Sequence, residues 1–590
     1  MNISEKINRR IILALFLSFF MLNSCTDSWL EPKPLSFLSP ENTFVNAEGM
    51  ESALVICRKH LQYEYNTNGD LTWISEYSTS DLAVAGMAGG MIDLTKDMLP
   101  SDAGDTDRNW ERGFDGINSA NIIISRVPDM EEPEEVKNMI LAEGYFHRSY
   151  WYYKLVNQYG DIPLILEETT FPKLDFYSST RDRIINRMID DMEFAVDWLP
   201  ESVISGKVNS AAAKHLLAKL YLTNGDFDKA IDIATEVIEG SDHQLMTSRF
   251  GAYADDPGKN VFWDLFQKEN ISLPENKEAI LVFQDRYLLE GGTSRGSRRG
   301  RYLVPAWYRA EMLDPSGNRG CTDGLEGEPL ISYTTRGIGK FKMTHYHARE
   351  IWYDAGNDIR HQWPNWFPMD SIYYNNPSSE FFEQPVQKEY CVDTLKCWDP
   401  FMYCKAYVED EDRPPGSGTN PTGGNSDWYI FRLAETYLLR AEAHVWKGEM
   451  GPAADDVNTI RSRVNASPLS AGDMSIETIL DERARELFFE EGRKSELTRI
   501  AFIMAKLGLR GYSLESIHES NFYYDRVMEK NEYFGTNYLY QSVAWTMRPH
   551  HILWPISEDV IASNSQGRIN QNYGYPGYED NVEPIGIDGE

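Results

Sequence analysis

The sequence predicts a mainly α-helical protein, in which tetratricopeptide-like helix pairs form a scaffold and one loop-rich insertion contains short strands. Apolar residues recur at helical spacing over several segments, namely 42–62, 110–127, 134–159, 181–199 and 475–490. Two of the later segments share a helix–glycine–helix spacing, and helical periodicity is nearly lost between them. The length of 590 residues allows about four domains, but these patterns favour one intertwined unit.

The first 24 residues have the pattern of a secretory signal peptide. Basic residues precede an apolar run at 11–22, which is too short to span a bilayer. The run ends in Leu-Asn-Ser-Cys, which resembles a bacterial lipobox and predicts Cys25 as the lipidated first residue of the mature chain. Simple cleavage, with Cys25 as a free or disulfide-bonded thiol, is the alternative. Residues 25–40 then form a flexible tether rich in proline and serine, before a single unit at 41–590.

The helix at 181–199 is predicted from one apolar stripe that stops at Pro200. Further along the chain, four positions recur with equal spacing in two segments. Small residues where helices cross, and a glycine at the turn between them, are typical of tetratricopeptide pairs. The matched positions are Ala218, Tyr221, Gly225 and Ala230 in the first segment, and Ala441, His444, Gly448 and Ala453 in the second.

The two pairs are separated by the stretch 246–427, where short β-like runs such as 279–283 alternate with Gly, Pro, Ser and Asn clusters. Long connections on a rigid scaffold usually carry binding groups, so this insertion is predicted to face the ligand. The scaffold is assigned to 41–245 and 428–510, and the remainder, 511–590, is a C-terminal region.

The charge balance excludes some partners. The chain has 57 Lys and Arg against 91 Asp and Glu, a net charge of −34, which disfavours nucleic acid and anionic membrane surfaces. The aromatic fraction of 13% is compatible with a neutral, polyhydroxylated ligand that lies flat on rings. Besides Cys25 there are five cysteines without zinc-ligand spacing, so no metal site or cofactor is expected. A bridge among Cys391, Cys397 and Cys404 stays open, as does calcium binding.

Six segments occur in a recognisable order. They are W-x3-F-x2-IN-x2-N at 110–121, YYKLVNQYGDIPLI at 152–165, LAKLYLTNGDFDKAIDIATEVI at 217–238, RLAETYLLRAEAH at 432–444, DERAREL at 481–487, and LWPI at 553–556 followed by NQN at 570–572. Together with the lipobox they resemble the SusD-like (RagB/SusD) family of Bacteroidetes outer-membrane lipoproteins. The resemblance implies a surface-exposed, lipid-anchored protein without catalytic activity, which captures oligosaccharides and delivers them to a SusC-like TonB-dependent transporter.

Two other functions are alternatives to this one. One is a tetratricopeptide-like surface scaffold that binds a protein or peptide, and the other is a surface glycoside hydrolase. A hydrolase needs two carboxylates about 5–9 Å apart, which no local spacing suggests. The acidic and basic residues of 481–493 instead have the spacing of i,i+3 and i,i+4 ion pairs on a helix, which predicts a structural role.

Sugar binding needs an aromatic ring for the apolar face of a pyranose and planar polar groups for its hydroxyls. The family offers no fixed motif for these groups, so local chemistry selects three candidate sets. The candidates are Trp73, Tyr77 and Asp81 in the first set, Tyr287, Arg295, Tyr302 and Trp307 in the second, and Trp363 in the third. The sequence does not rank the sets and names neither the glycan nor its linkage.

Overall fold

The computed structural model describes residues 44–66, 72–86, 98–102, 104–293, 296–323, 334–411, 423–540 and 543–587. The signal peptide, Cys25 and the tether lie outside these residues, and so does Arg295. Among the described helices, none combines the length and apolar character needed to cross a membrane.

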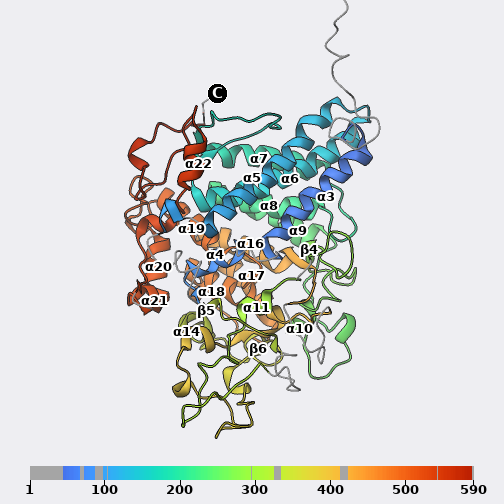
Figure 1. Ribbon diagram of the computed structural model, residues 1–590. Helices are drawn as coiled ribbons and strands as arrows, with labels where there is room; N and C mark the ends of the chain where they lie inside the picture. Colours follow the sequence, from blue (N-terminus) through green and yellow to red (C-terminus); the bar gives the residue numbers. More distant parts are fainter. Residues whose placement is uncertain are drawn as a thin grey trace, which may run out of the picture.

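The N-terminal part is a stack of long helices, drawn in blue to green in Figure 1. Its elements are α3 (Ala47–Tyr65), α4 (Thr72–Ser78), α5 (Gly104–Arg126), α6 (Glu134–Tyr159), α7 (Arg181–Trp198), α8 (Ser210–Asn224) and α9 (Phe227–Gly240), with the short strands β1 (Ala83–Ala85), β2 (Ile162–Pro163) and β3 (Ser178–Ser179). The predicted apolar stripe of α7 is buried at Ile185, Met188, Ile189 and Met192. The side chain of Thr180 caps the first turn of this helix.

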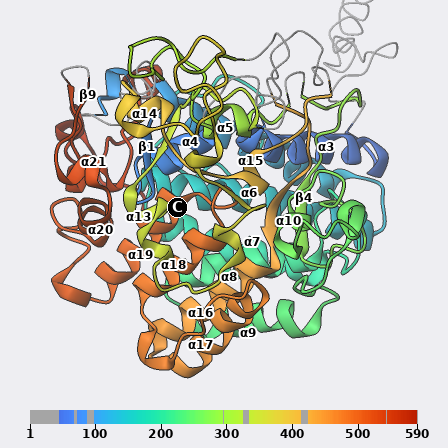
Figure 2. The same cartoon turned by 90° about the horizontal axis from the view of Figure 1, so that it is seen from below.

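Both predicted helix pairs are confirmed. α8 joins α9 through Gly225, and α16 (Leu433–Lys447) joins α17 (Met450–Arg463) through Gly448. Each glycine adopts a left-handed conformation, with φ of +91° and +77°, so the backbone itself favours glycine at these turns. The paired alanines are buried, and α9 packs against α16, which brings the two distant pairs together (Figure 2).

The insertion lies at the bottom of Figure 1 in green and yellow, and consists mainly of irregular chain. Its elements are α10 (Val261–Leu265), β4 (Ala279–Phe283), α11 (Arg299–Leu303), β5 (Phe341–Met343), α13 (His345–Ala348), β6 (Trp366–Phe367), α14 (Thr394–Cys397), β7 (Phe401–Met402) and α15 (Tyr403–Ala406). The predicted strand at 279–283 is therefore confirmed. Cys391, Cys397 and Cys404 are buried free thiols.

β4 pairs with β8 (Trp428–Arg432), which immediately precedes α16. The two strands are antiparallel, with Ala279 opposite Arg432 at one end and Phe283 opposite Trp428 at the other. Most of the insertion therefore leaves and re-enters the scaffold at a single point, the Phe283–Trp428 end of this ribbon.

The C-terminal part continues the helical scaffold and then runs along the left edge of Figure 1 in red. Beyond α17 it contains α18 (Ile476–Glu486), α19 (Arg493–Lys506), α20 (Phe522–Lys530), α21 (Glu532–Gly535) and α22 (Glu558–Ser563), with strands β9 (Leu539–Tyr540) and β10 (Val543–Ala544). Together with the N-terminal stack, these elements confirm a mainly α-helical fold that carries a loop-rich insertion.

The helix predicted over 475–490 ends earlier, at Glu486. The ammonium group of Lys405 donates hydrogen bonds to the carbonyl oxygens of Glu486 (2.7 Å) and Phe488 (2.9 Å), and so caps the end of the helix. The acidic and basic residues here do have a structural role, but the predicted local pairing is largely wrong. Only Arg485 and Glu482 form an i,i+3 pair, whereas Glu486 contacts arginines from three other segments.

Candidate functional site

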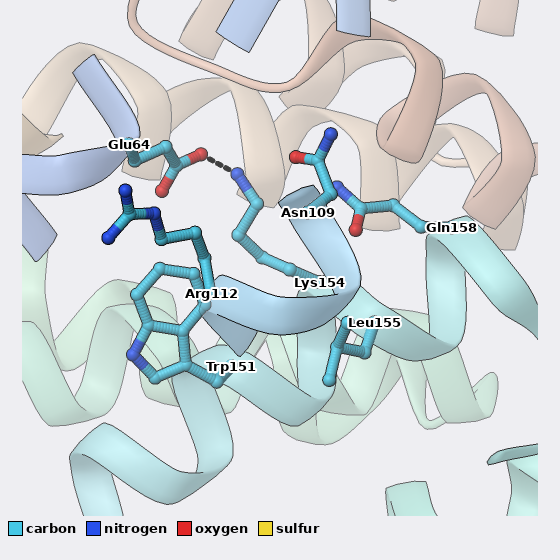
Figure 3. Close-up of a pocket in the computed structure, with 7 residues that line it drawn as sticks. All are labelled: Glu64, Asn109, Arg112, Trp151, Lys154, Leu155 and Gln158. Carbon is cyan, nitrogen blue, oxygen red and sulfur yellow. Dashed lines mark ion pairs between the residues drawn. The ribbon is translucent and has the colours of Figure 1, made fainter. Parts of the chain in front are cut away.

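Three cavities differ in size and lining. The smallest holds about 10 Å³, enough for a single water, and lies among α3, α5 and α6. Figure 3 shows the Lys154 ammonium group pointing at Glu64, with which it forms an ion pair inside this cavity. The largest, of about 560 Å³, lies beside the α7–α8 connection, and no Trp, Tyr or Phe is among its lining residues.

The third cavity, of about 410 Å³, lies where the insertion leaves the scaffold, and we call it the ribbon-end cleft. An aromatic ring, that of Tyr287, lines it together with carboxylate, amide and basic groups. Its lining residues are Lys268, Glu269, Ser272, Leu273, Asp285, Arg286, Tyr287, Glu411, Asn425, Ser426 and Asp427. Because it combines sufficient volume with an aromatic ring and hydrogen-bonding groups, this cleft is the best candidate of the three for a sugar-binding site.

The β4–β8 ribbon explains why two aspartates meet in this cleft. Asp285 follows the end of β4 and Asp427 precedes the start of β8, so antiparallel pairing brings both to the same end of the ribbon. The backbone amide of Asp285 donates a hydrogen bond of 3.0 Å to the Asp427 carboxylate. Residues that are 142 positions apart in the chain thus form one wall.

Both carboxylates are buried and held by donors. Asp285 accepts hydrogen bonds from the side-chain amides of Asn66 (2.8 Å) and Asn425 (2.7 Å). The backbone amide and hydroxyl of Thr293 also donate to Asp285, each at 2.8 Å. These four bonds come from neutral donors, and they satisfy the carboxylate and fix the cleft wall.

Asp427 has different partners. Its carboxylate accepts from the Ser272 hydroxyl at 2.5 Å and from the Arg286 guanidinium at 3.1 Å. The Arg286 side chain remains 49% exposed, so most of it faces solvent. Asp427 therefore connects the buried wall to the open side of the cleft.

The accessible groups of the cleft are an aromatic ring and charged side chains. Tyr287 is 36% exposed and follows Arg286 directly in the chain. Lys268, which also lines the cleft, pairs with Glu411 at 2.7 Å. An aromatic ring beside basic donors and acidic acceptors suits a polyhydroxylated ligand, since hydroxyl groups both donate and accept hydrogen bonds.

The first predicted set does not line this cleft, and its residues are core residues. Trp73 is 6% exposed and packs edge-on against Phe489, at 5.1 Å between ring centroids. The hydroxyl of Tyr77, which is also buried, donates to the carbonyl oxygen of Glu491 at 2.6 Å. Neither ring presents a free face, so the prediction that Trp73 and Tyr77 stack on sugar is corrected.

Asp81, the third member of this set, is fully buried between two arginines. Its carboxylate pairs with Arg493 and Arg526, each at 2.7 Å. Burial acts to raise the pKa of Asp81, but the two guanidinium groups outweigh it and hold the pKa below its ordinary value. Asp81 therefore links the end of α4 to α19 and α20, and its assignment to glycan binding is corrected.

The residues of the second predicted set lie in different surroundings. Tyr287 lies in the ribbon-end cleft, whereas Tyr302 and Trp307 are buried, with the Tyr302 hydroxyl bonded to Arg298 at 3.1 Å. These two are corrected to core residues, because α11 and the chain after it turn inward. Trp363, in the third set, is 57% exposed and lies outside the residues that line this cleft.

The sequence reasoning missed Asp285, Asn425 and Asp427. The signal that would have found them is the apolar run at 428–432, which could have been paired with the predicted strand at 279–283. Polar residues at adjoining strand ends would then have marked the cleft.

A tetratricopeptide-like scaffold interrupted by a large insertion defines the class of fold, and comparisons with known proteins define the family. The model of the SusD family matches residues 277–575, which is about half of the chain. A second model, described as starch-binding associating with outer membrane, matches residues 29–222. The chain belongs to the SusD family.

Relatives agree with this assignment. SusD-like protein P2 of Formosa agariphila is 30% identical over 222 residues, which cover 37% of this chain and 44% of that protein. This chain thus spans less than half of the length of that relative. The starch-binding protein SusD of Bacteroides thetaiotaomicron is 24% identical, over 66% of this chain and 68% of that protein.

Solved structures show the same fold. A laminarin-binding SusD-like protein matches with a TM-score of 0.61 and 19% identity, over 89% of this chain and all but 1% of the other. NanU of B. fragilis matches with a TM-score of 0.63 and 17% identity, over 92% of this chain and the whole of NanU.

Proposed function

We propose that this protein is a cell-surface lipoprotein that captures oligosaccharides and delivers them to a SusC-like TonB-dependent outer-membrane transporter. Membership of the SusD family supports the proposal, as does the family description that links starch binding to the outer membrane. The names of two similar proteins point the same way, since one binds starch and the other laminarin. We further propose that Cys25 carries the lipid anchor and that the insertion 246–427 faces the ligand.

The observation that carries the proposal is the ribbon-end cleft. Its volume of about 410 Å³ lies within the range of small-ligand sites, and its rim combines the Tyr287 ring with the Arg286 guanidinium. The apolar face of a sugar ring would lie against Tyr287, and its hydroxyls would bond to the charged groups around it.

The same geometry favours binding without bond cleavage. A glycoside hydrolase needs one carboxyl group that holds a proton and donates it to the leaving oxygen. The oxygens of Asp285 already accept hydrogen bonds from Asn66, Thr293 and Asn425, so neither is left facing a substrate. We therefore propose recognition and transfer of the intact glycan.

The test is affinity electrophoresis of residues 26–590 against a panel of polysaccharides. We expect retention by at least one glycan and a loss of about 1–3 kcal/mol in binding free energy for Tyr287→Ala. Tyr353→Ala is the matched control, because Tyr353 is an exposed tyrosine of the insertion that does not line the cleft. Retention by no glycan would contradict the proposal, and capture of a protein or peptide instead would support the scaffold alternative.

Two further measurements separate the remaining alternatives. Release of reducing sugar during incubation with a bound glycan would identify a hydrolase and contradict the binding role. For the anchor, Cys25→Ala in the full chain is expected to move the protein from the membrane fraction to the soluble fraction. Continued membrane retention of that variant would contradict lipidation at Cys25.

A further inference from the structure

Trp363 is the one exposed tryptophan in the part of the chain that the structure describes, with 57% of its surface accessible. Its ring stacks on Tyr403, at 5.5 Å between centroids and an interplanar angle of 20°. Phe367 packs edge-on against it at 6.0 Å. Because neighbouring rings hold the indole, its exposed surface is a preorganised platform.

Lys259 adds a cation to this platform. Its ammonium nitrogen lies 4.0 Å from the centroid of the Trp263 ring and 5.3 Å from that of Trp363. Tyr403 stacks on Trp263 as well, at 5.5 Å, so the two indoles, the phenol and the ammonium group form one cluster.

The ammonium group of Lys259 differs from that of Lys405, which also lies over an aromatic ring. Lys405 lies over Phe266 but also pairs with Glu490 at 2.6 Å. Within the described residues, Lys259 forms no ion pair, and Asp256 acts on it only at longer range. In a chain with a net charge of −34, a cation without a carboxylate partner beside an exposed indole is a specific feature of this surface.

We propose that Trp363 and Lys259 form an outer subsite for an anionic sugar, that is, a pyranose that carries a carboxylate or a sulfate ester. The apolar face of the ring would lie on Trp363, and the anionic substituent would pair with the ammonium group of Lys259. This inference rests on the proposed glycan binding and adds the charge of the ligand to it.

The position of the subsite agrees with this role. Lys259 precedes α10, and Lys268, which lines the ribbon-end cleft, follows it, so one short helix separates the two lysines along the chain. The acidic groups Glu269 and Glu411 line the cleft, whereas on the other side Asp256 acts on the Lys259 ammonium group only at longer range.

The experiment measures equilibrium binding of residues 26–590 to two matched pairs of glycans. One pair is an oligogalacturonate and its methyl ester, and the other is dextran sulfate and dextran. We expect the wild type to prefer the charged member of one pair by about tenfold, and the pair concerned distinguishes a carboxylate from a sulfate.

Variants assign the preference to residues. Lys259→Met is expected to abolish the preference for the charged member while binding of the neutral member stays unchanged. Trp363→Ala is expected to weaken binding of both members by about tenfold, because the stacking platform is lost. Lys229→Met is the matched control, since Lys229 also lies over a ring, that of Tyr221, but on the helical scaffold.

The two proposals fail differently. Equal binding of charged and neutral members in both pairs, or an unchanged preference in a folded Lys259→Met variant, would overturn the outer subsite and leave glycan binding intact. Absence of binding to all glycans, the four probes and the wider panel alike, would overturn both. Thermal unfolding of each variant establishes that it is folded, and affinities are compared between folded proteins.

Discussion

The two ends of the β4–β8 ribbon contain acidic residues in opposite surroundings. At the Ala279–Arg432 end, the carboxylates are paired with basic side chains and shielded from water. The members of this closed charge cluster are Glu278, Lys405, Arg432, Arg463, Glu486 and Glu490. At the other end, Asp285 and Asp427 are held mainly by amides and hydroxyls, and the wall that they form opens to solvent.

The difference shows what each end does. In the closed cluster every charge is neutralised by the opposite sign, so no group remains to bind a ligand and the cluster joins the insertion to the scaffold. At the open end, mainly neutral donors fix the carboxylates, and the Arg286 guanidinium that bonds to Asp427 stays partly exposed. The presence of acidic residues alone therefore does not identify a binding site. What distinguishes the two ends is whether the carboxylates are paired with buried basic side chains or held mainly by neutral donors.

The largest expected effect is on stability at the closed end. Glu486 contacts Arg432 at 2.7 Å and Arg360 at 2.9 Å, and also pairs with Arg463. Glu486→Gln leaves these buried guanidinium groups short of one negative charge, so we expect the free energy of unfolding to fall by about 3–5 kcal/mol. Urea unfolding at neutral pH measures this change.

Glu239→Gln is the control, because Glu239 forms an exposed ion pair with Arg440. We expect it to change the free energy of unfolding by less than about 1 kcal/mol. If Glu486→Gln were as mild as this control, the closed cluster would contribute little to the fold and the contrast between the two ribbon ends would disappear.

A second effect concerns pH. Burial acts to raise the pKa of Glu482, but Arg360, Arg485 and Arg461 outweigh it and lower the pKa from 4.5 to about 2. As the pH falls, the unfolded chain takes up this proton first. The contribution of Glu482 to stability is therefore complete above about pH 4.5 and is lost progressively toward pH 2.

Urea unfolding of the wild type and of Glu482→Gln at several pH values tests this. The free energy of unfolding of the wild type should fall more steeply below pH 4.5 than that of the variant, because the variant lacks the titrating group. Parallel curves for the two proteins would show that Glu482 does not titrate differently in the folded state.

Much of the fold follows from sequence periodicity. The stripe of α7 and the glycine turns at Gly225 and Gly448 are local patterns that fix local structure. The end of α18 could not be predicted in this way, because it depends on Lys405, which lies 81 residues before Glu486 in the chain. Side chains from distant segments determine such boundaries.

The site was harder to predict for the same reason. The same local pattern, an aromatic residue beside small polar groups, occurs at Trp73, Tyr77 and Tyr287. Only Tyr287 of these three is exposed. Burial of Tyr77 depends on its contact with Glu491, more than 400 residues away in the chain. Local composition therefore selects candidate rings, and only the tertiary structure shows which of them reaches solvent.

The smallest expected effect is at the open end, at Asp427. Asp427→Asn keeps the shape of the side chain but replaces one accepting oxygen with a donor. It therefore weakens either the bonds from Arg286 and Ser272, which share one oxygen, or the bond from the Asp285 backbone amide to the other oxygen. We expect a loss of about 1–3 kcal/mol in the free energy of unfolding, below that at Glu486, because the guanidinium that loses its negative partner, that of Arg286, is 49% exposed.

The same substitution is expected to weaken glycan binding, since Arg286 is released from its position beside Tyr287. Affinity electrophoresis and urea unfolding of one protein preparation measure both effects, with Asp232→Asn on the exposed face of α9 as the control. A variant that loses stability but keeps full affinity would mean that Asp427 supports the fold alone. The open end of the ribbon would then have a structural role, as the closed end has. Glycan binding would depend on Tyr287 and not on the wall formed by Asp285 and Asp427.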